Sequence, residues 1–374
     1  MSARQVIVRA GRLGAQGIAI LLLSFGLMLG MLEIWAQTQP RRYFVEFDEL
    51  LGFQNQPGAT GVYRGRWFLA TNPHINAPIH INAMGLRGPE RRADKPSGTR
   101  RLMVLGDSFV QAFEVPWEEA FYALLEERAR AASTSALETF PMGVNGYGQG
   151  QQLLWLRRDG LGWDPDFVLL VVFLGNDVTD NSQVIGAGGS RPYFELAGGE
   201  LVQVAQPNES ARFKYWVANH LRGYLLYREL AVRFGGLRAA ARKLGWVNTP
   251  QSGGHLDPLA RQRLSRAWTL TLALIEEIAS ESRAAGAGFG LAFHGRFPTG
   301  GDETGRERMR RFCFERGLDC LDLTQKLEGD EANFIPDDHH WTARGHTRVA
   351  QAIWARWGPA LVGERVSSDV AELP

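Results

Sequence analysis

The chain has 374 residues, of which 45% are hydrophobic and 22% are charged, and its formal net charge at pH 7 is +1. This composition is that of an ordinary globular protein with room for one large domain or two modest ones. Basic residues occur in runs no longer than a pair, so the sequence gives no sign of a nucleic-acid-binding protein.

The first segment is apolar. Residues Ile18 to Trp35 contain only Ser24 and Glu33 as polar side chains, and three arginines precede them, Arg4, Arg9 and Arg12. About 20 apolar residues suffice for a helix to cross a bilayer. We therefore expect a transmembrane anchor over residues 14–36, with residues 1–13 in the cytoplasm and the rest of the chain exported, in the single-pass topology of an inner-membrane protein with a periplasmic domain.

A cleaved signal peptide is the alternative to this anchor. Signal peptides usually have a shorter apolar region that ends in a small-residue cleavage site, and Ala36-Gln37-Thr38 is a poor site of that kind. Arg41 and Arg42, just beyond the apolar segment, weaken the charge bias that sets the orientation. We favour the uncleaved anchor.

Residues 37–99 are rich in proline, glycine, asparagine and aromatic residues. This pattern predicts an extended collar or lid with a few short strands, and residues 91–98 have the composition of an exposed linker. From residue 100 the chain alternates between strand and helix patterns up to about residue 360, and a tail over 361–374 follows.

The predicted strands are Arg101–Gly106, a second ending near Pro141, Phe167–Leu174, Phe289–Phe293 and Leu318–Leu323, and the predicted helices are Trp117–Ala131, a second from Gln149, Asp257–Ala285, Glu303–Arg316 and a last one with Val349, Ile353 and Trp357 on one side. Phe167–Leu174 is apolar throughout, as a strand covered on both faces requires. Five such units predict an α/β fold, a flavodoxin-like three-layer α/β/α sandwich with a parallel sheet.

An insertion interrupts the alternation over about 181–255. Arg191–Leu196 and Glu200–Val204, separated by two glycines, predict a hairpin. A basic amphipathic helical stretch follows over about 212–244, which is either a solvated face or a lid or membrane-surface patch.

Three predicted strands end in polar loops that contain glycine, namely Gly106-Asp107-Ser108, Asn145-Gly146 and Gly175-Asn176-Asp177. Carboxyl ends of parallel strands share one edge of a sheet, so these loops are expected to be neighbours. Gly-Asp-Ser alone is also ordinary turn chemistry that can cap a helix. The histidine-rich loop before the last helix, Asp337-Asp338-His339-His340, can reach the same edge.

These side chains are the parts that acyl transfer requires. A serine hydroxyl needs a base to remove its proton, imidazole suits that role near neutral pH, and a carboxylate fixes the tautomer of the imidazole. The N–H of Ser108, the N–H of Gly146 and the Asn176 amide could donate to an oxyanion.

The four blocks resemble, in order, those of the SGNH (GDSL-type) esterase and lipase superfamily, and the whole chain looks like its bacterial membrane-anchored members. The resemblance implies a hydrolase with Ser108 as nucleophile, His340 as base, and Gly146 and Asn176 completing the oxyanion hole. The usual spacing of the superfamily would make Asp337 the triad acid, and the spacing in some envelope-acting relatives would make it Asp338, which we favour.

The sequence thus predicts a membrane-anchored serine esterase that hydrolyses or transfers an acyl group, most simply acetyl, on a cell-envelope glycan. A lipid or lysophospholipid esterase and a catalytically silent glycan-binding or assembly protein are the alternatives. The acyl group, the alcohol and the oligomeric state stay open. No cofactor is expected, because Gly146–Gly150 lacks the residues of a phosphate loop.

Three further residue sets have more than one interpretation. His339, His340 and His346 could bind a metal, but their spacing fixes no shared face, so no metal is expected. His294, after a strand, is either a core or surface histidine or a substrate contact. Cys313 and Cys320 form a disulfide in an exported domain or remain two buried thiols.

Overall fold

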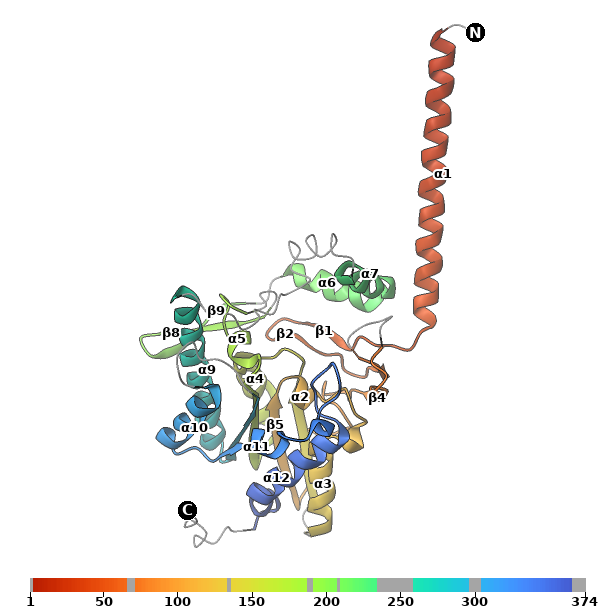
Figure 1. Cartoon of the computed structure of the whole chain (residues 1–374). Coiled ribbons are helices and arrows are strands. Elements are labelled where there is room, and N and C mark those ends of the chain that lie inside the picture. The colour runs from red at the N-terminus through yellow and green to blue at the C-terminus, as the bar shows by residue number, and fades with distance from the viewer. Residues whose placement is uncertain are drawn as a thin grey trace.

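A computed structural model of the chain describes residues 3–65, 71–132, 136–186, 191–206, 209–233, 258–295 and 304–364. Its centre is a five-stranded parallel sheet (Figure 1). The strands are β5 (Thr99–Gly106), β6 (Ala136–Gly143), β7 (Phe167–Phe173), β10 (Gly288–His294) and β11 (Cys320–Asp322).

The strands lie in the spatial order β11-β10-β7-β5-β6. Numbered along the chain within this sheet, that order is 2-1-3-4-5, the flavodoxin-like arrangement, so the predicted fold class is confirmed. The central strand β7 is buried at every residue except the last, which explains its wholly apolar sequence. In this topology the switch between β5 and β7 places the ends of those strands at the edge where such folds bind ligands.

Helices cover both faces of the sheet (Figure 1). One face is covered by α4 (Gln149–Trp155), α9 (Pro258–Ala284) and α10 (Gly305–Arg316), which contribute Leu153, Trp268 and Met309 to the core on that side. On the other face Phe121 and Val349 represent α3 (Phe121–Ala132) and α12 (Ala343–Val362), which lie with the short helices α2 (Ser108–Gln111) and α11 (Thr324–Leu327). The three-layer sandwich follows from this alternation of sides.

Some helix boundaries differ from the sequence-based expectation. The stretch expected as one helix from Trp117 begins with the 3-10 turn Trp117–Glu119, and Ala120 is extended before α3 starts. Helix α4 continues into a π-helical turn over Leu156–Gly160 and a 3-10 turn over Leu161–Trp163. The helix cap expected at Asp257 and the helix start expected at about Glu303 lie outside the described residues.

The N-terminal region begins with helix α1 (Ala3–Thr38), which projects from the rest of the molecule (Figure 1). Its segment Ala15–Thr38 has a mean hydropathy of 2.2, which makes it long and apolar enough to cross a membrane. Two antiparallel hairpins follow, β1 (Val45–Asp48) with β2 (Gly52–Asn55) and β3 (Thr60–Tyr63) with β4 (Ala77–His80).

The hairpins are fastened to the sheet by buried polar contacts. Asn55 Nδ2 donates to the carbonyl of Gly143 at 3.2 Å, and Gln111 Nε2 donates to Asn55 Oδ1 at 2.6 Å. The Arg87 guanidinium, 2% exposed, donates to the carbonyls of Ala112 and Val115. The hairpins therefore contact the segment that follows β5, where Ser108 lies.

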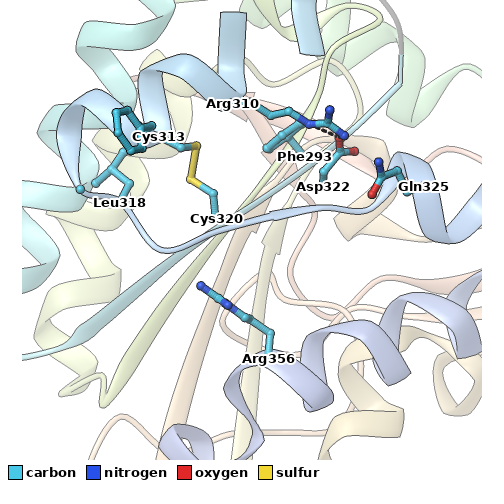
Figure 2. A pocket seen from close by; sticks show the side chains of 10 residues that line it. Phe293, Arg310, Cys313, Leu318, Cys320, Asp322, Gln325 and Arg356 are labelled. Carbon is cyan, nitrogen blue, oxygen red and sulfur yellow. Dashed lines mark hydrogen bonds and ion pairs between the residues drawn. A yellow bond between two sulfur atoms is a disulfide. The ribbon is translucent and has the colours of Figure 1, made fainter. Parts of the chain in front are cut away.

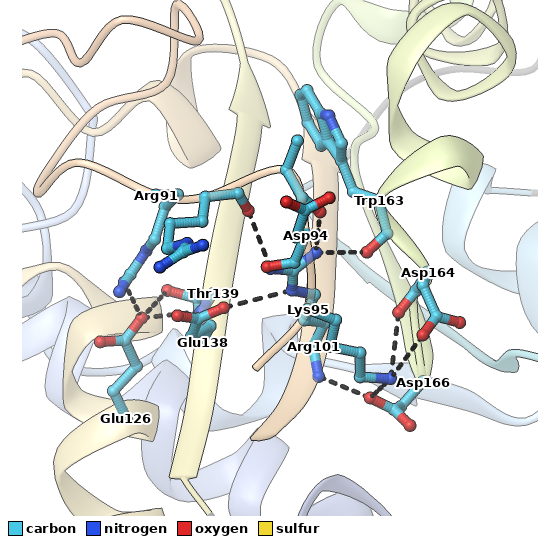
Figure 3. A network of polar contacts seen from close by, with 12 residues as sticks. Arg91, Asp94, Lys95, Arg101, Glu126, Glu138, Thr139, Trp163, Asp164 and Asp166 are labelled. Atoms are coloured by element: carbon cyan, nitrogen blue, oxygen red, sulfur yellow. Dashed lines mark hydrogen bonds and ion pairs between the residues drawn. The ribbon is translucent and has the colours of Figure 1, made fainter. Parts of the chain in front are cut away.

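The segment 91–98 crosses the other end of β5 (Figure 3). Arg101 is fully buried and donates to the carbonyls of Arg92, Ala93, Asp94 and Trp163, while Glu138 pairs with its Nε at 3.2 Å. Lys95 pairs with Asp166 at 2.7 Å. The segment is exposed, as expected, yet one guanidinium holds three of its carbonyls.

The insertion contains the predicted hairpin, β8 (Tyr193–Ala197) with β9 (Glu200–Ala205). The helical stretch is two helices, α6 (Glu209–His220) and α7 (Arg222–Arg233), which meet at Leu221. The expected continuation to residue 244 lies outside the described residues. The remaining short elements are α5 (Asp177–Asp180) and the 3-10 turn Glu331–Asn333.

Cys313 and Cys320 form a disulfide that joins α10 to β11. It lies in the wall of a surface depression of about 620 Å³ (Figure 2). The arginines of this depression are already paired, Arg310 with Asp322 at 2.6 Å and Arg356 with Asp319 at 2.6 Å. Of the two states considered from the sequence, the structure has the disulfide.

Candidate active site

Ser108 lies directly after β5, in the turn that starts α2. The side chain of Asp107 caps this helix by accepting the Phe109 N–H at 3.0 Å. The turn is tightly enclosed, because a Cβ on Gly143 of the neighbouring strand would lie 2.6 Å from the Gln111 nitrogen. Packing and capping together fix the position of the Ser108 hydroxyl. Ser108 as a whole is 8% exposed.

His340 meets Ser108 from the loop before α12. Its Nε2 lies 2.8 Å from Ser108 Oγ, and its Nδ1 lies 2.5 Å from Asp338 Oδ1. A backbone hydrogen bond from Ile335 N–H to the His340 carbonyl, at 2.8 Å, closes the loop. The three side chains form a continuous hydrogen-bonded chain from carboxylate to imidazole to hydroxyl, the order in which a serine triad works.

The structure does not bring Asp337 to this chain. Asp337 is exposed and has a left-handed backbone with φ 62°, and His339 has φ 70°. These two left-handed residues turn the loop so that Asp338, and not Asp337, faces the imidazole. Asn72 of the N-terminal region donates to the Pro336 carbonyl at 3.1 Å and so braces the start of the loop.

A second carboxyl group, Glu114, also faces His340. Its Oε1 is 3.7 Å from His340 Nδ1, and its side chain is 4% exposed. Helix α2 ends at Ala112 in a left-handed conformation with φ 51°, which turns the chain back toward the histidine. Sequence reasoning missed Glu114, because nothing in the residues after Ser108 signals that turn.

These surroundings set the pKa of His340. Burial acts to lower it, but the nearby Glu114 and Asp338 carboxylates outweigh burial and raise the pKa to about 9. Burial raises the pKa of Glu114 itself, while His340 acts to lower it. In the opposite sense, the bond to His340 holds the pKa of Asp338 below its usual value despite the effect of burial.

The other two candidate oxyanion donors lie in loops that are tied together. Arg191 Nη1 donates to the carbonyl of Gly146 at 3.0 Å and pairs with Asp180 Oδ1 at 3.0 Å, and Asp180 accepts from Asn176 Nδ2 at 2.7 Å. Gly146 has φ 80°, a left-handed conformation that favours glycine. One polar chain thus joins the loops after β6 and β7.

Asp107 connects that chain to the serine turn. Burial raises its pKa to about 6, and a hydrogen bond from Asn176 is among the effects that oppose this rise. Asp177, fully buried, accepts from Gln149 Nε2 at 2.7 Å, and its pKa is raised well above the usual value by burial and by Asp107. Asp180 and Arg191 were not predicted from the sequence, because Asp180 lies at the start of the insertion and Arg191 lies within it.

An aromatic cluster forms the wall behind the histidine. Phe109 packs against His340 with ring centroids 4.8 Å apart and against Trp341 at 4.7 Å. His294 lies in this cluster, 4.2 Å from Phe109, and burial lowers its pKa to about 3. Of the two possibilities raised from the sequence, the structure places His294 in the core.

The candidate metal histidines separate in space. His346 is buried, and its Nδ1 faces the Phe121 N–H at 3.3 Å, whereas His339 is exposed in the loop. Glu114, Asp338 and His340 do present three possible ligand atoms within 4.8 Å of one another. His340 Nε2 contacts Ser108 Oγ at 2.8 Å, so these three residues can equally be a candidate base with two carboxyl partners.

Comparisons with known proteins returned no matching family model and no matching curated protein. The solved structures that the chain matches include a lipase/acylhydrolase from Enterococcus faecalis, at 14% identity and a TM-score of 0.35, covering 69% of this chain and 95% of that one. A putative lipolytic protein of the G-D-S-L family from Desulfitobacterium hafniense matches at 11% identity, TM-score 0.37, with 67% and 98% covered.

An acetyl xylan esterase matches at 14% identity and a TM-score of 0.37, with 68% of this chain and 98% of that one covered. Similarity at this level supports no conclusion about activity. Any activity of this chain must therefore be argued from its own residues. The structure itself has a parallel sheet in flavodoxin-like order, with Ser108, Gly146, Asn176 and His340 in the loops at its C-terminal edge.

Proposed function

We propose that the chain is a serine esterase in which Ser108 is the nucleophile, His340 the general base and Asp338 the triad acid. The observation that carries the proposal is the hydrogen-bonded chain from Asp338 through His340 to Ser108, with distances of 2.5 and 2.8 Å. A serine that merely caps a turn needs no imidazole at its hydroxyl.

In the proposed reaction Ser108 Oγ attacks the ester carbonyl carbon while His340 Nε2 takes the hydroxyl proton. The N–H groups of Ser108 and Gly146 and the Asn176 amide donate to the oxyanion that forms, and each such donor is worth about 3 to 4 kcal/mol in comparable sites. His340 then protonates the leaving alcohol. Water, or an acceptor hydroxyl in a transfer reaction, releases the acyl group by the same steps.

The proposed substrate is an acyl ester, most simply an acetyl ester, of a cell-envelope glycan. The polar residues around Gly146 and Asn176, namely Asp180 and Arg191, favour a hydroxylated alcohol over a hydrocarbon chain. An anchor at α1 would hold the domain against the envelope, with the domain outside the cytoplasm. A lipid ester is the other substrate class that the experiment below must separate.

The test uses the full chain and a serine-reactive phosphonate. Labelling is expected in the natural protein and in Ser97→Ala, an exposed serine in the segment before β5, and is expected to be lost in Ser108→Ala. Ser108→Ala should also reduce ester hydrolysis by about 10³-fold or more with the fold unchanged, as loss of a triad nucleophile does elsewhere.

Turnover of acetyl esters is then compared with turnover of long-chain esters. A preference for acetyl esters supports the glycan substrate, and a preference for long acyl chains would replace it by the lipid substrate. Full labelling of Ser108→Ala would refute the nucleophile, and with it the esterase.

A further inference from the structure

Helix α6 has two faces of different character. Its inner face packs on the β1–β2 hairpin, where Tyr215 stacks on Phe53 with ring centroids 6.0 Å apart and Asn219 Nδ2 donates to the Val45 carbonyl at 2.9 Å. Ala211 and Ala218 are buried on this face, each 2% exposed. These contacts of α6 with the domain therefore come from one side of the helix.

The outer face is exposed, yet it is aromatic. Phe213 is 69% exposed and Trp216 is 51% exposed, and together with His220 they follow the three- and four-residue spacing of one helical face. Their rings stack in sequence, Phe213 on Trp216 and Trp216 on His220. Leu221, at the junction with α7, and Tyr227, on α7, are also exposed, at 45% and 44%.

The junction of α6 and α7 is attached to the end of α1. Glu33 of α1 accepts the backbone N–H groups of Arg222 and Gly223 at 2.9 and 2.6 Å, so it caps the first turn of α7. Gln37 Nε2 donates to the His220 carbonyl at 3.0 Å. A Cβ on Gly223 would lie 2.8 Å from Glu33 Oε2, so the attachment is close.

These contacts place the aromatic face beside the apolar helix. Helices α6 and α7 lie across the end of the domain from which α1 projects (Figure 1). Ile34 and Trp35, at the same end of α1, are apolar residues that are 69% and 44% exposed. Tryptophan and tyrosine with an apolar body and a polar edge are the residues that proteins place at the level of lipid headgroups.

We propose that the outer face of α6, with Leu221 and Tyr227, lies in the interfacial layer of the bilayer that α1 crosses and holds the catalytic domain in one orientation against the membrane. The partner is a phospholipid surface. The proposal rests on the anchor proposed for α1 and is independent of the esterase activity.

The location of the face favours lipid over a second copy of the chain. A bilayer crossed by Ala15–Thr38 must end near Glu33 and Gln37, the residues that hold the α6–α7 junction. A helix fixed at that level with an apolar outer face meets headgroups and upper acyl chains without further movement. The C-terminal edge of the sheet, with α2 and α5, is turned to the same side (Figure 1), so the serine would face the membrane-proximal layer.

The experiment measures lipid contact at one position of α6. A cysteine is introduced as Phe213→Cys in the full chain, with Cys313 and Cys320 kept as the disulfide, and is labelled with an environment-sensitive fluorophore. The protein is reconstituted in phosphatidylcholine–phosphatidylglycerol vesicles with and without nitroxide lipids. Phe213 lies seven residues, about 10 Å along the helix, from the attached junction, so the label probes the outer face of α6 at a distance from that junction.

The matched control carries the label at Glu127→Cys, an exposed residue of α3, and Figure 1 shows this helix in the lower part of the view, away from α6 and α7. We expect blue-shifted emission that nitroxide lipids quench at position 213, unquenched emission at position 127, and weaker quenching at 213 after Trp216→Ser. Equal emission and quenching at the two positions would overturn the proposal. A blue shift at 213 that nitroxide lipids do not quench would overturn it in favour of a protein partner.

Failure of the anchor gives a different result. If the chain does not float with the vesicles, or its N-terminus is found near Gln37, the anchor is wrong and the proposed orientation is wrong with it. Esterase activity and phosphonate labelling of Ser108 are measured on the same samples, and neither depends on where α6 lies.

Discussion

Replacing Glu114 by glutamine should move the pH dependence of esterase activity. His340 must be neutral to accept the Ser108 proton, and its pKa is raised to about 9, with burial opposing the nearby carboxylates. Activity of the natural protein should therefore rise with pH up to about 9, where the imidazole becomes neutral. At pH 7 roughly 1 in 100 of the imidazoles is then neutral.

The separation of 3.7 Å between Glu114 Oε1 and His340 Nδ1 sets the size of the effect. At an effective dielectric constant of about 20, two unit charges at that distance interact by about 4 to 5 kcal/mol, which corresponds to a ceiling of about 3 pKa units. Because burial raises the pKa of Glu114, we expect the decrease in the pKa of His340 to be smaller than this ceiling. A one-unit decrease makes about ten times more neutral base available at pH 7.

The assay is kcat/KM for an acetyl ester against pH from 5 to 10, and the position of the acid limb is compared, not the height of the plateau. Glu118→Gln, an exposed glutamate four residues further on, is the matched control and should leave the limb in place. The reasoning is refuted if Glu114→Gln and the natural protein have the same acid limb. That result would mean that Glu114 does not raise the pKa of His340.

Three further outcomes are expected. Asp338→Asn should cut turnover by up to about 10⁴-fold, as loss of the orienting carboxylate does in other triads, while Asp337→Asn costs little; equal, small effects in a turnover assay would mean that His340 works without a triad acid. Asp177→Asn should raise the melting temperature at pH 8 more than at pH 4, because a carboxyl whose folded-state pKa is raised loses stability as pH rises above its unfolded pKa; equal melting shifts at both pH values would argue against a buried proton there. A reporter fused after Pro374 should register as exported in an activity assay of the reporter, and a cytoplasmic signal would contradict the proposed topology.

The sheet was predictable because local pattern and tertiary environment agree. The apolar run at β7 needs both faces covered, and the strand order found around it is that of the predicted flavodoxin-like fold. The loops with Ser108, Gly146 and Asn176 could be placed at one edge for the same reason: all parallel strands end there.

Parts of the site that depend on backbone reversals were not predictable. The left-handed residue Ala112, which brings Glu114 to the histidine, is an alanine that gives no sequence signal. The choice between Asp337 and Asp338 depends on two left-handed residues, Asp337 and His339, in the loop. Spacing alone left both aspartates open, and only the backbone shows which one meets the imidazole.

The buried contacts of Arg101 have a consequence for where substrate must be. This guanidinium holds the carbonyls of Arg92, Ala93 and Asp94, and the Asn55–Gln111 bond holds the β1–β2 hairpin ahead of them, so the described parts of the chain between the apolar helix and the serine are attached to the domain. A slack tether of n residues lets a domain explore a radius that grows with about √n. If α1 is the proposed anchor, attachment at these points would hold Ser108 at a fixed height above the membrane. The proposed esterase would then act on esters at that height, and esters further out would have to move inward to react.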